Sequence, residues 1–88
     1  MDNQKLGIFI TELRKEKGLT QAQLAQKLNV TDKAVSKWER GVGFPDIKLL
    51  EPLADVLDIS LLELMNSKRL PKTTVSAPDT TDAFQNVI

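Results

Sequence analysis

Two pairs of helix-start and helix-stop signals follow each other in the sequence TQAQLAQKLNVTDKAVSKWERG. Thr20 can cap the first helix, with Gln23 three residues later completing a capping box, and Asn29 is suited to a left-handed helix end. Thr31 can cap the second helix, and Gly41 can end it. The segment is therefore predicted to form two short helices joined by a tight turn, the arrangement of a helix-turn-helix.

Apolar residues at helical spacing predict another helix before this motif. It is expected to be amphipathic and to run from near Asn3 to Gly18. Trp38 shares the apolar face of the second capped helix, so it is interpreted as a core residue rather than a platform for base stacking. The buried faces of these three helices are predicted to consist of Leu6, Phe9, Ile10, Leu13, Leu24, Ala25, Leu28, Ala34, Val35 and Trp38.

A fourth helix is predicted after Gly41, and Pro45 and Asp46 are signals for its start. Pro52 lies well inside its pattern and predicts a kink or a late start, because proline removes a backbone hydrogen bond and crowds the preceding turn. The core stripe of this helix is predicted to be Ile47, Leu50, Leu53, Ala54 and Leu57.

Ser60 and Glu63 form another capping box, which predicts a fifth helix from Leu61 to Ser67 or Lys68. No strand pattern is found, so the predicted fold class is all-α, a compact five-helix bundle. The last part of the chain is rich in Thr, Ser, Pro and Asp and has no sustained period. We therefore expect one domain over residues 1–69 and a flexible tail or linker over residues 70–88.

Composition argues against several classes of function. The chain has no cysteine and no histidine, which excludes thiolate metal sites and removes the most common general base. No phosphate-binding loop or metal-ligand cluster is found, and Glu12 with Glu16 is an ordinary helical pair. We expect no enzymatic activity and no cofactor. No apolar run is long enough to span a membrane, so a cytoplasmic protein is expected.

The formal net charge is zero, but the charges are unevenly distributed. Residues 1–41 carry eight basic and five acidic side chains, whereas residues 42–66 carry one basic and five acidic side chains. The basic excess therefore lies on the half that contains the helix-turn-helix, where it would attract a phosphate backbone.

The second capped helix carries a polar stripe opposite its apolar face. Lys33, Ser36, Lys37 and Arg40 fall within this stripe. Lys33 and Lys37 can reach guanine O6 and N7, and Ser36 can donate or accept a hydrogen bond. Arg40, at the far end, is better placed for the DNA backbone. Taken singly, each residue can equally belong to a solvated surface.

Three residues near helix starts complete the predicted DNA-binding set. Thr31 offers a methyl group and a hydroxyl group at the start of the second capped helix. Asp32 must point aside or accept a hydrogen bond from cytosine N4, because its carboxylate repels phosphate. Gln21 can bind a phosphate beside the exposed amides of the first capped helix, although a plain surface position is an equal alternative.

Residues 14–41, together with the following sequences FPD and LADVLDISLLELM, resemble the phage repressor and Cro type of helix-turn-helix, the XRE family. The resemblance covers about residues 4–68. It implies that Gln21 binds phosphate and that helix 31–40 enters the major groove. The base-reading positions that it implies are Asp32, Lys33 and Lys37.

The resemblance also implies an ion pair between Arg14 and Glu39, which would tie the first helix to the DNA-reading helix. The alternative is that both residues lie on the surface. The chain departs from many relatives in the loop after Gly41, where the sequence VGF replaces a stretch that can carry basic phosphate contacts. Pro52 is a second departure.

The leading hypothesis is a sequence-specific transcriptional regulator, in particular a repressor, that binds double-stranded DNA. A homodimer on an inverted-repeat operator is expected, because one helix reads only a few base pairs. The candidate dimer surface on the fifth helix comprises Leu61, Leu62, Leu64 and Met65, and the alternative is that most of these residues belong to the core. The alternative is a regulator such as an antitoxin, whose tail binds a partner protein and whose DNA binding is secondary.

Overall fold

Five helices form within residues 2–70, the part of the chain that the computed structural model describes. They are α1 (Asn3–Glu16), α2 (Gln21–Leu28), α3 (Asp32–Glu39), α4 (Ile47–Val56) and α5 (Leu61–Asn66). No strand occurs in this range, so the predicted all-α five-helix fold is confirmed. The predicted tail lies, beyond Leu70, outside the described residues.

Side-chain caps start the helices where the sequence predicts. Thr20 Oγ1 accepts a hydrogen bond from the Gln23 N–H (3.0 Å), and Gln23 Oε1 accepts one from the Thr20 N–H (2.8 Å). Ser60 and Glu63 repeat this reciprocal pair at 3.0 and 2.9 Å. Asn29 ends α2 in the left-handed conformation, with φ of 58°. Each cap satisfies backbone donors that a helix end leaves without a partner.

Two helices end slightly earlier than predicted. α1 stops at Glu16, and the left-handed residue Gly18 (φ 69°) follows two positions later. α5 stops at Asn66, because Ser67 takes the left-handed conformation with φ of 54°.

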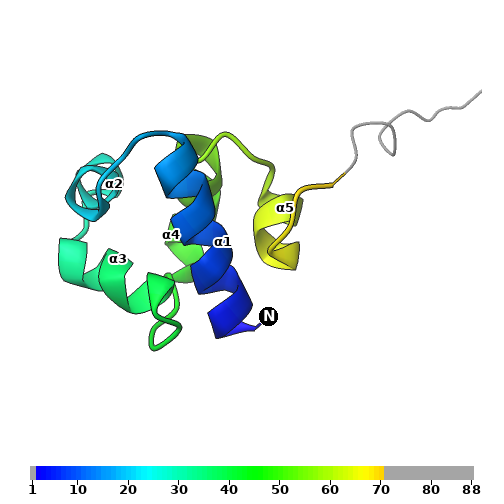
Figure 1. The fold of residues 1–88 in the computed structure, drawn as a ribbon, viewed down its shortest axis with the longest axis horizontal. Coiled ribbons are helices and arrows are strands. Elements are labelled where there is room, and N and C mark those ends of the chain that lie inside the picture. Colours follow the sequence, from blue (N-terminus) through cyan, green and yellow to red (C-terminus); the bar gives the residue numbers. More distant parts are fainter. Residues whose placement is uncertain (1, 71–88) are drawn as a thin grey trace, which may run out of the picture.

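The five helices pack around a single apolar core. α1 lies in the middle of Figure 1, with α2 and α3 to one side of it and α5 to the other. α4 packs against α2 and α5 and completes the bundle. Fourteen buried apolar residues form the core: Leu6, Phe9, Ile10, Leu13, Leu24, Ala25, Leu28, Val35, Trp38, Leu50, Leu53, Ala54, Leu57 and Leu64. Ala34, also predicted to be buried, packs against this core only partly covered.

The predicted core position of Ile47 is wrong, because its side chain is 80% exposed. Ile47 is the first residue of α4 and lies at the edge of the apolar stripe. Pro45, just before the helix, is fully buried instead. The core is therefore closed at this end by the loop rather than by the helix.

Pro52 does not delay the start of α4, which begins at Ile47 under an Asp46 cap. Of the two predicted effects of Pro52, the late start does not occur, and the kink stays a prediction. Pro52 and Lys48 are both exposed, so they share the solvent-facing side of the helix. The Lys48 carbonyl has no helical N–H donor, because Pro52 lacks one, but water can hydrate it. Hydration lowers the free-energy cost of having a proline inside the helix.

Glu63 holds the chain on both sides of α5. Its carboxylate accepts hydrogen bonds from the backbone N–H of Ser60 and from that of Leu70, each at 2.9 Å. These hydrogen bonds lower the pKa of Glu63.

Among residues 2–70, no helix has the length and apolar character needed to cross a membrane.

Candidate nucleic-acid interface

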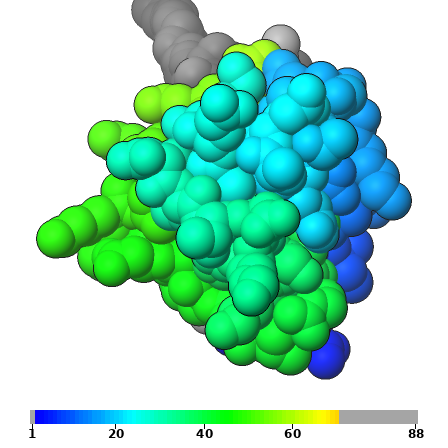
Figure 2. Space-filling view, turned by 90° about the vertical axis from the view of Figure 1, so that its left-hand side faces the viewer, coloured from blue at the N-terminus to red at the C-terminus, as the bar shows by residue number. Residues whose placement is uncertain are grey.

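α2 and α3 lie together on one face of the molecule, shown toward the viewer in Figure 2 with α2 in cyan and α3 in blue-green. The loop after α3 continues the same face below them. α5 lies on the opposite side of α1, so it leaves this face open.

The polar stripe of α3 is exposed and is supported from beneath. Lys33, Lys37 and Arg40 are all exposed. On the opposite side of the helix, Val35 is fully buried and Trp38 is 5% exposed. Within residues 2–70, none of the three cations forms an ion pair with a carboxylate. Their positive charge is therefore available to an outside anion.

The other predicted residues of α3 take part in local hydrogen bonds. Thr31 Oγ1 accepts from the backbone N–H of Ala34 (3.2 Å), which caps the helix and leaves the hydroxyl hydrogen free. Ser36 Oγ accepts from Arg40 Nε (3.2 Å), so these two side chains lie together. Asp32 is exposed in the first turn, where the helix dipole favours a carboxylate.

The Glu39 carboxylate brings three helices together. Arg14 of α1 donates to it through Nε (2.6 Å) and Nη2 (3.1 Å), and Gln21 of α2 donates through Nε2 (3.0 Å). The Arg14 and Glu39 side chains are only 11% and 6% exposed. Arg14 Nη1 also donates to the Leu19 carbonyl (2.7 Å). The guanidinium group therefore links the residue just before the α2 cap to the last residue of α3.

Burial alone would raise the pKa of Glu39, but the hydrogen bonds from Arg14 and Gln21 and the charge of Arg14 outweigh burial. The pKa of Glu39 therefore lies below its ordinary value. A carboxylate that stays ionised keeps Gln21 in place, with one amide hydrogen and the carbonyl oxygen of Gln21 left for an outside partner.

Gly7 is a structural residue of the site that the sequence interpretation missed. A methyl group in place of its hydrogen would lie 2.4 Å from the Trp38 carbonyl oxygen and 2.7 Å from the Glu39 carbonyl oxygen. α1 therefore crosses the end of α3 at a distance that only glycine permits. The signal in the sequence was a lone glycine between Leu6 and Phe9, on the apolar side of a predicted helix.

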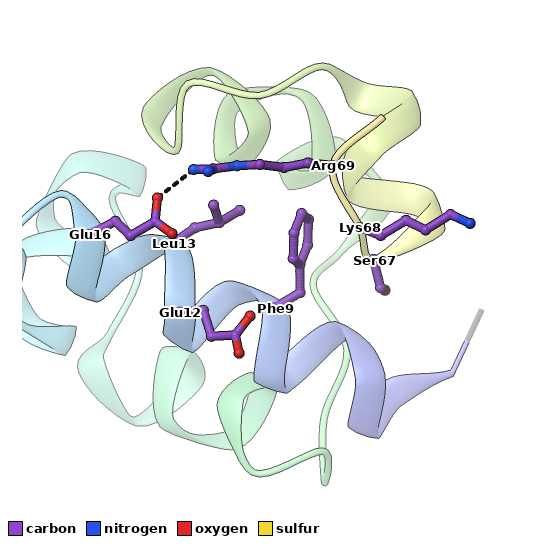
Figure 3. A pocket seen from close by; sticks show the side chains of 7 residues that line it. All are labelled: Phe9, Glu12, Leu13, Glu16, Ser67, Lys68 and Arg69. Carbon is purple, nitrogen blue, oxygen red and sulfur yellow. Dashed lines mark hydrogen bonds and ion pairs between the residues drawn. The ribbon is translucent and has the colours of Figure 1, made fainter. Parts of the chain in front are cut away.

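A shallow groove lies on the other side of α1. Figure 3 shows its floor, formed by Phe9 and Leu13, and the ion pair between Arg69 and Glu16 that crosses it. The remaining lining residues are Glu12, Ser67 and Lys68. The ion pair holds the segment after α5 against α1, and the groove lies between these two parts of the chain.

Comparison with known proteins assigns the chain to a class. The profile of the Helix-turn-helix family matches residues 10–64, which include the whole of α2, α3 and α4. The chain therefore belongs to the XRE-type helix-turn-helix family, a family of DNA-binding transcription regulators.

Individual relatives support this assignment. The chain is 38% identical over 68 residues to the HTH-type transcriptional activator BcrR of Enterococcus faecalis, covering 77% of this chain and 31% of BcrR. It is 39% identical over 64 residues to the transcriptional regulator SinR of Bacillus licheniformis, covering 72% of this chain and 58% of SinR. The chain thus spans 31% of the length of BcrR and 58% of the length of SinR.

Two solved structures have the same fold. The restriction-modification controller protein C.AhdI of Aeromonas hydrophila superposes with a TM-score of 0.67 at 36% identity, covering 72% of this chain and 96% of that one. SinR, the master regulator for biofilm formation, superposes in its complex with DNA with a TM-score of 0.63 at 38% identity, covering 68% and 97%.

Proposed function

We propose that this protein is a sequence-specific DNA-binding transcription regulator that inserts α3 into the major groove. The observation that carries the proposal is the exposed cationic stripe of α3, which forms no ion pair among residues 2–70 and is supported by the buried side chains of Val35 and Trp38. The similarity to SinR, solved in complex with DNA, supports the same conclusion.

Each predicted side chain has a specific role in this proposal. Lys33 and Lys37 contact guanine edges, and Ser36 contributes a hydrogen bond. Arg40, whose Nε donates to Ser36 Oγ at the far end of the stripe, binds the DNA backbone. Gln21, oriented by Glu39, donates to a phosphate at the start of α2.

Asp32 and Thr31 act at the start of α3. The Thr31 hydroxyl hydrogen and methyl group face the DNA beside the helix cap. The Asp32 carboxylate accepts a hydrogen bond from cytosine N4.

A homodimer on an inverted repeat completes the proposed regulator. α5 exposes Leu61, Leu62 and Met65 at 37%, 58% and 46%, whereas Leu64 is fully buried and belongs to the core, which was the alternative for this surface. Because α5 packs on the side of α1 away from α3, a dimer through α5 leaves both DNA-binding faces open. Such a dimer can span half-sites roughly 34 Å apart. Leu62→Glu is expected to yield a monomer in light scattering.

Regulation of a promoter as a repressor requires no chemistry, so the proposal includes neither an enzymatic activity nor a cofactor. It places the protein with the DNA, in the cytoplasm.

A protein partner is the second candidate. SinR is also known in a complex with the SinI protein. The exposed α5 residues of this chain offer an apolar surface on which a protein partner could bind. In this reading, DNA binding is secondary and partner binding controls it, as in an antitoxin. The partner would compete with the second copy of the chain for α5.

The decisive experiment selects bound duplexes from a random pool with the full chain. Enrichment of an inverted repeat is expected. Lys37→Ala should then weaken binding to the selected duplex by about 1 to 3 kcal/mol and relax base preference at one position. Lys68→Ala, which removes the same charge beyond α5, is the matched control and should change little. If no duplex is enriched, or if affinity is insensitive to salt, the DNA-binding proposal fails.

A further inference from the structure

The backbone after α3 turns back along the side chain of Lys37. Gly41 takes a positive φ of 75° and donates its N–H to the Trp38 carbonyl (3.1 Å), while the Val42 N–H donates to the Lys37 carbonyl (3.0 Å). This pair of bonds is a Schellman motif, which reverses the chain at the helix end. Gly43 follows directly and lies against the stem of Lys37.

The space at Gly43 is small enough to matter. A methyl group there would lie 3.1 Å from Lys37 Cβ and 3.9 Å from Lys37 Cδ. Contacts between carbon atoms are optimal near 3.5 to 4.0 Å, so the added methyl group and Lys37 Cβ would have to move apart by a few tenths of an ångström. Because Cβ is fixed to the backbone of α3, rotation of the lysine side chain cannot relieve this contact. The loop and the end of α3 must therefore shift against each other, and this shift redirects the Lys37 stem.

The backbone at Gly43 does not itself require glycine. Its φ lies outside the left-handed region, unlike that of Gly41 and Gly18. An alanine at position 43 therefore introduces no backbone strain, and its main effect is the contact with Lys37.

We propose that Gly43 is a positioning residue for specificity: by leaving the loop without a side chain, it sets the direction in which Lys37 leaves α3 toward the base edges. This proposal rests on the DNA-reading role proposed above for Lys37. Gly43 itself contacts no base. Its side-chain-free surface lets the lysine stem run along the loop, and the ammonium group at the end of the stem reads the base.

The test is a double-mutant cycle with the full chain. Wild type, Gly43→Ala, Lys37→Ala and the double variant are measured on the selected duplex and on its single-base variants. Gly43→Ala is expected to change base preference about threefold to tenfold at the position that Lys37→Ala affects, part of what one good base contact discriminates. In the Lys37→Ala background, the contact with Cβ remains, but the effect of Gly43→Ala on base preference at that position should disappear, because no ammonium group is left to read the base.

Two further measurements separate the possible failures. Gly18→Ala strains a left-handed residue that has no atom within 4 Å, so it should lower stability without changing base preference. In the DNA-free protein, the carbon chemical shifts of the Lys37 side chain should change in Gly43→Ala and stay unchanged in Gly18→Ala.

Equal effects of Gly43→Ala in both Lys37 backgrounds, or unchanged Lys37 shifts, would overturn the positioning role of Gly43. If wild type enriches no duplex but the Lys37 shifts do change, the contact stands, and the proposed DNA-binding function fails together with the specificity role that depends on it.

Discussion

Replacing Gly7 with alanine is expected to destabilise the domain, although alanine is the better helix former. In a helix interior, alanine is favoured over glycine by about 0.8 to 1 kcal/mol. At this site, however, the added methyl group would lie 2.4 and 2.7 Å from two carbonyl oxygens of α3. Ordinary contact begins near 3.4 Å, so α1 and the end of α3 must separate by close to 1 Å.

The cost of this separation falls near the upper end of the about 1 to 3 kcal/mol typical of overpacking, because backbone atoms of a packed helix cannot rotate away. After the gain in helix propensity is subtracted, the expected net loss is about 2 kcal/mol. For a domain of this size, the midpoint of thermal unfolding should fall by about 8 to 16 °C.

Urea and thermal unfolding followed by circular dichroism will measure the effect. Gly18→Ala is the control, since it adds backbone strain of about 1 kcal/mol but meets no neighbouring atom. If Gly7→Ala is as stable as wild type, or more stable, the close crossing of α1 and α3 is refuted.

Three other predictions concern stability. Because the pKa of Glu39 lies below its ordinary value, the ionised Glu39 carboxylate stabilises the folded state above about pH 5, and this stabilisation is lost as the pH falls through the lowered pKa. In urea unfolding, Glu39→Gln should therefore make the free energy of unfolding depend less on pH in the acidic range. Thr20→Ala removes the cap of α2 and should cost about 1 kcal/mol by the same assay, whereas Thr20→Ser should retain it. Leu53→Ala should cost about 2 to 5 kcal/mol, while the matched Ile47→Ala should cost less than about 1 kcal/mol because Ile47 is exposed; equal losses would restore Ile47 to the core.

Local signals explain why most of the fold is predictable from this sequence. The Thr20 and Ser60 caps and the left-handed Asn29 depend on residues within one helical turn, so the sequence alone specifies them. Helical periodicity likewise identifies nearly all of the core. Ile47 is the exception, because a helix-end residue lies at the edge of its stripe and a neighbouring loop decides whether it is covered.

The candidate site is less predictable, because its supporting contacts join residues distant in sequence. The exposed stripe of α3 follows from periodicity, but the hydrogen bond from Gln21 to Glu39 depends on how α2 meets α3. The close approach at Gly7 depends on the crossing of α1 and α3. Neither contact has a pattern in the local sequence that specifies its partner.

These contacts give α1 a part in DNA reading although it lies behind α3. Gly7 meets the backbone at the end of α3, and Arg14, two turns further along α1, holds the Glu39 side chain. Although these two points lie about 10 Å apart along α1, both act at Glu39, so together they fix the position of the end of α3. The start of α3 is held separately, through α2 and the short turn between them. Substitutions at Gly7 or Arg14 should therefore change base preference by tilting α3 as a unit, whereas substitutions at Lys33 or Lys37 should each change a single base position.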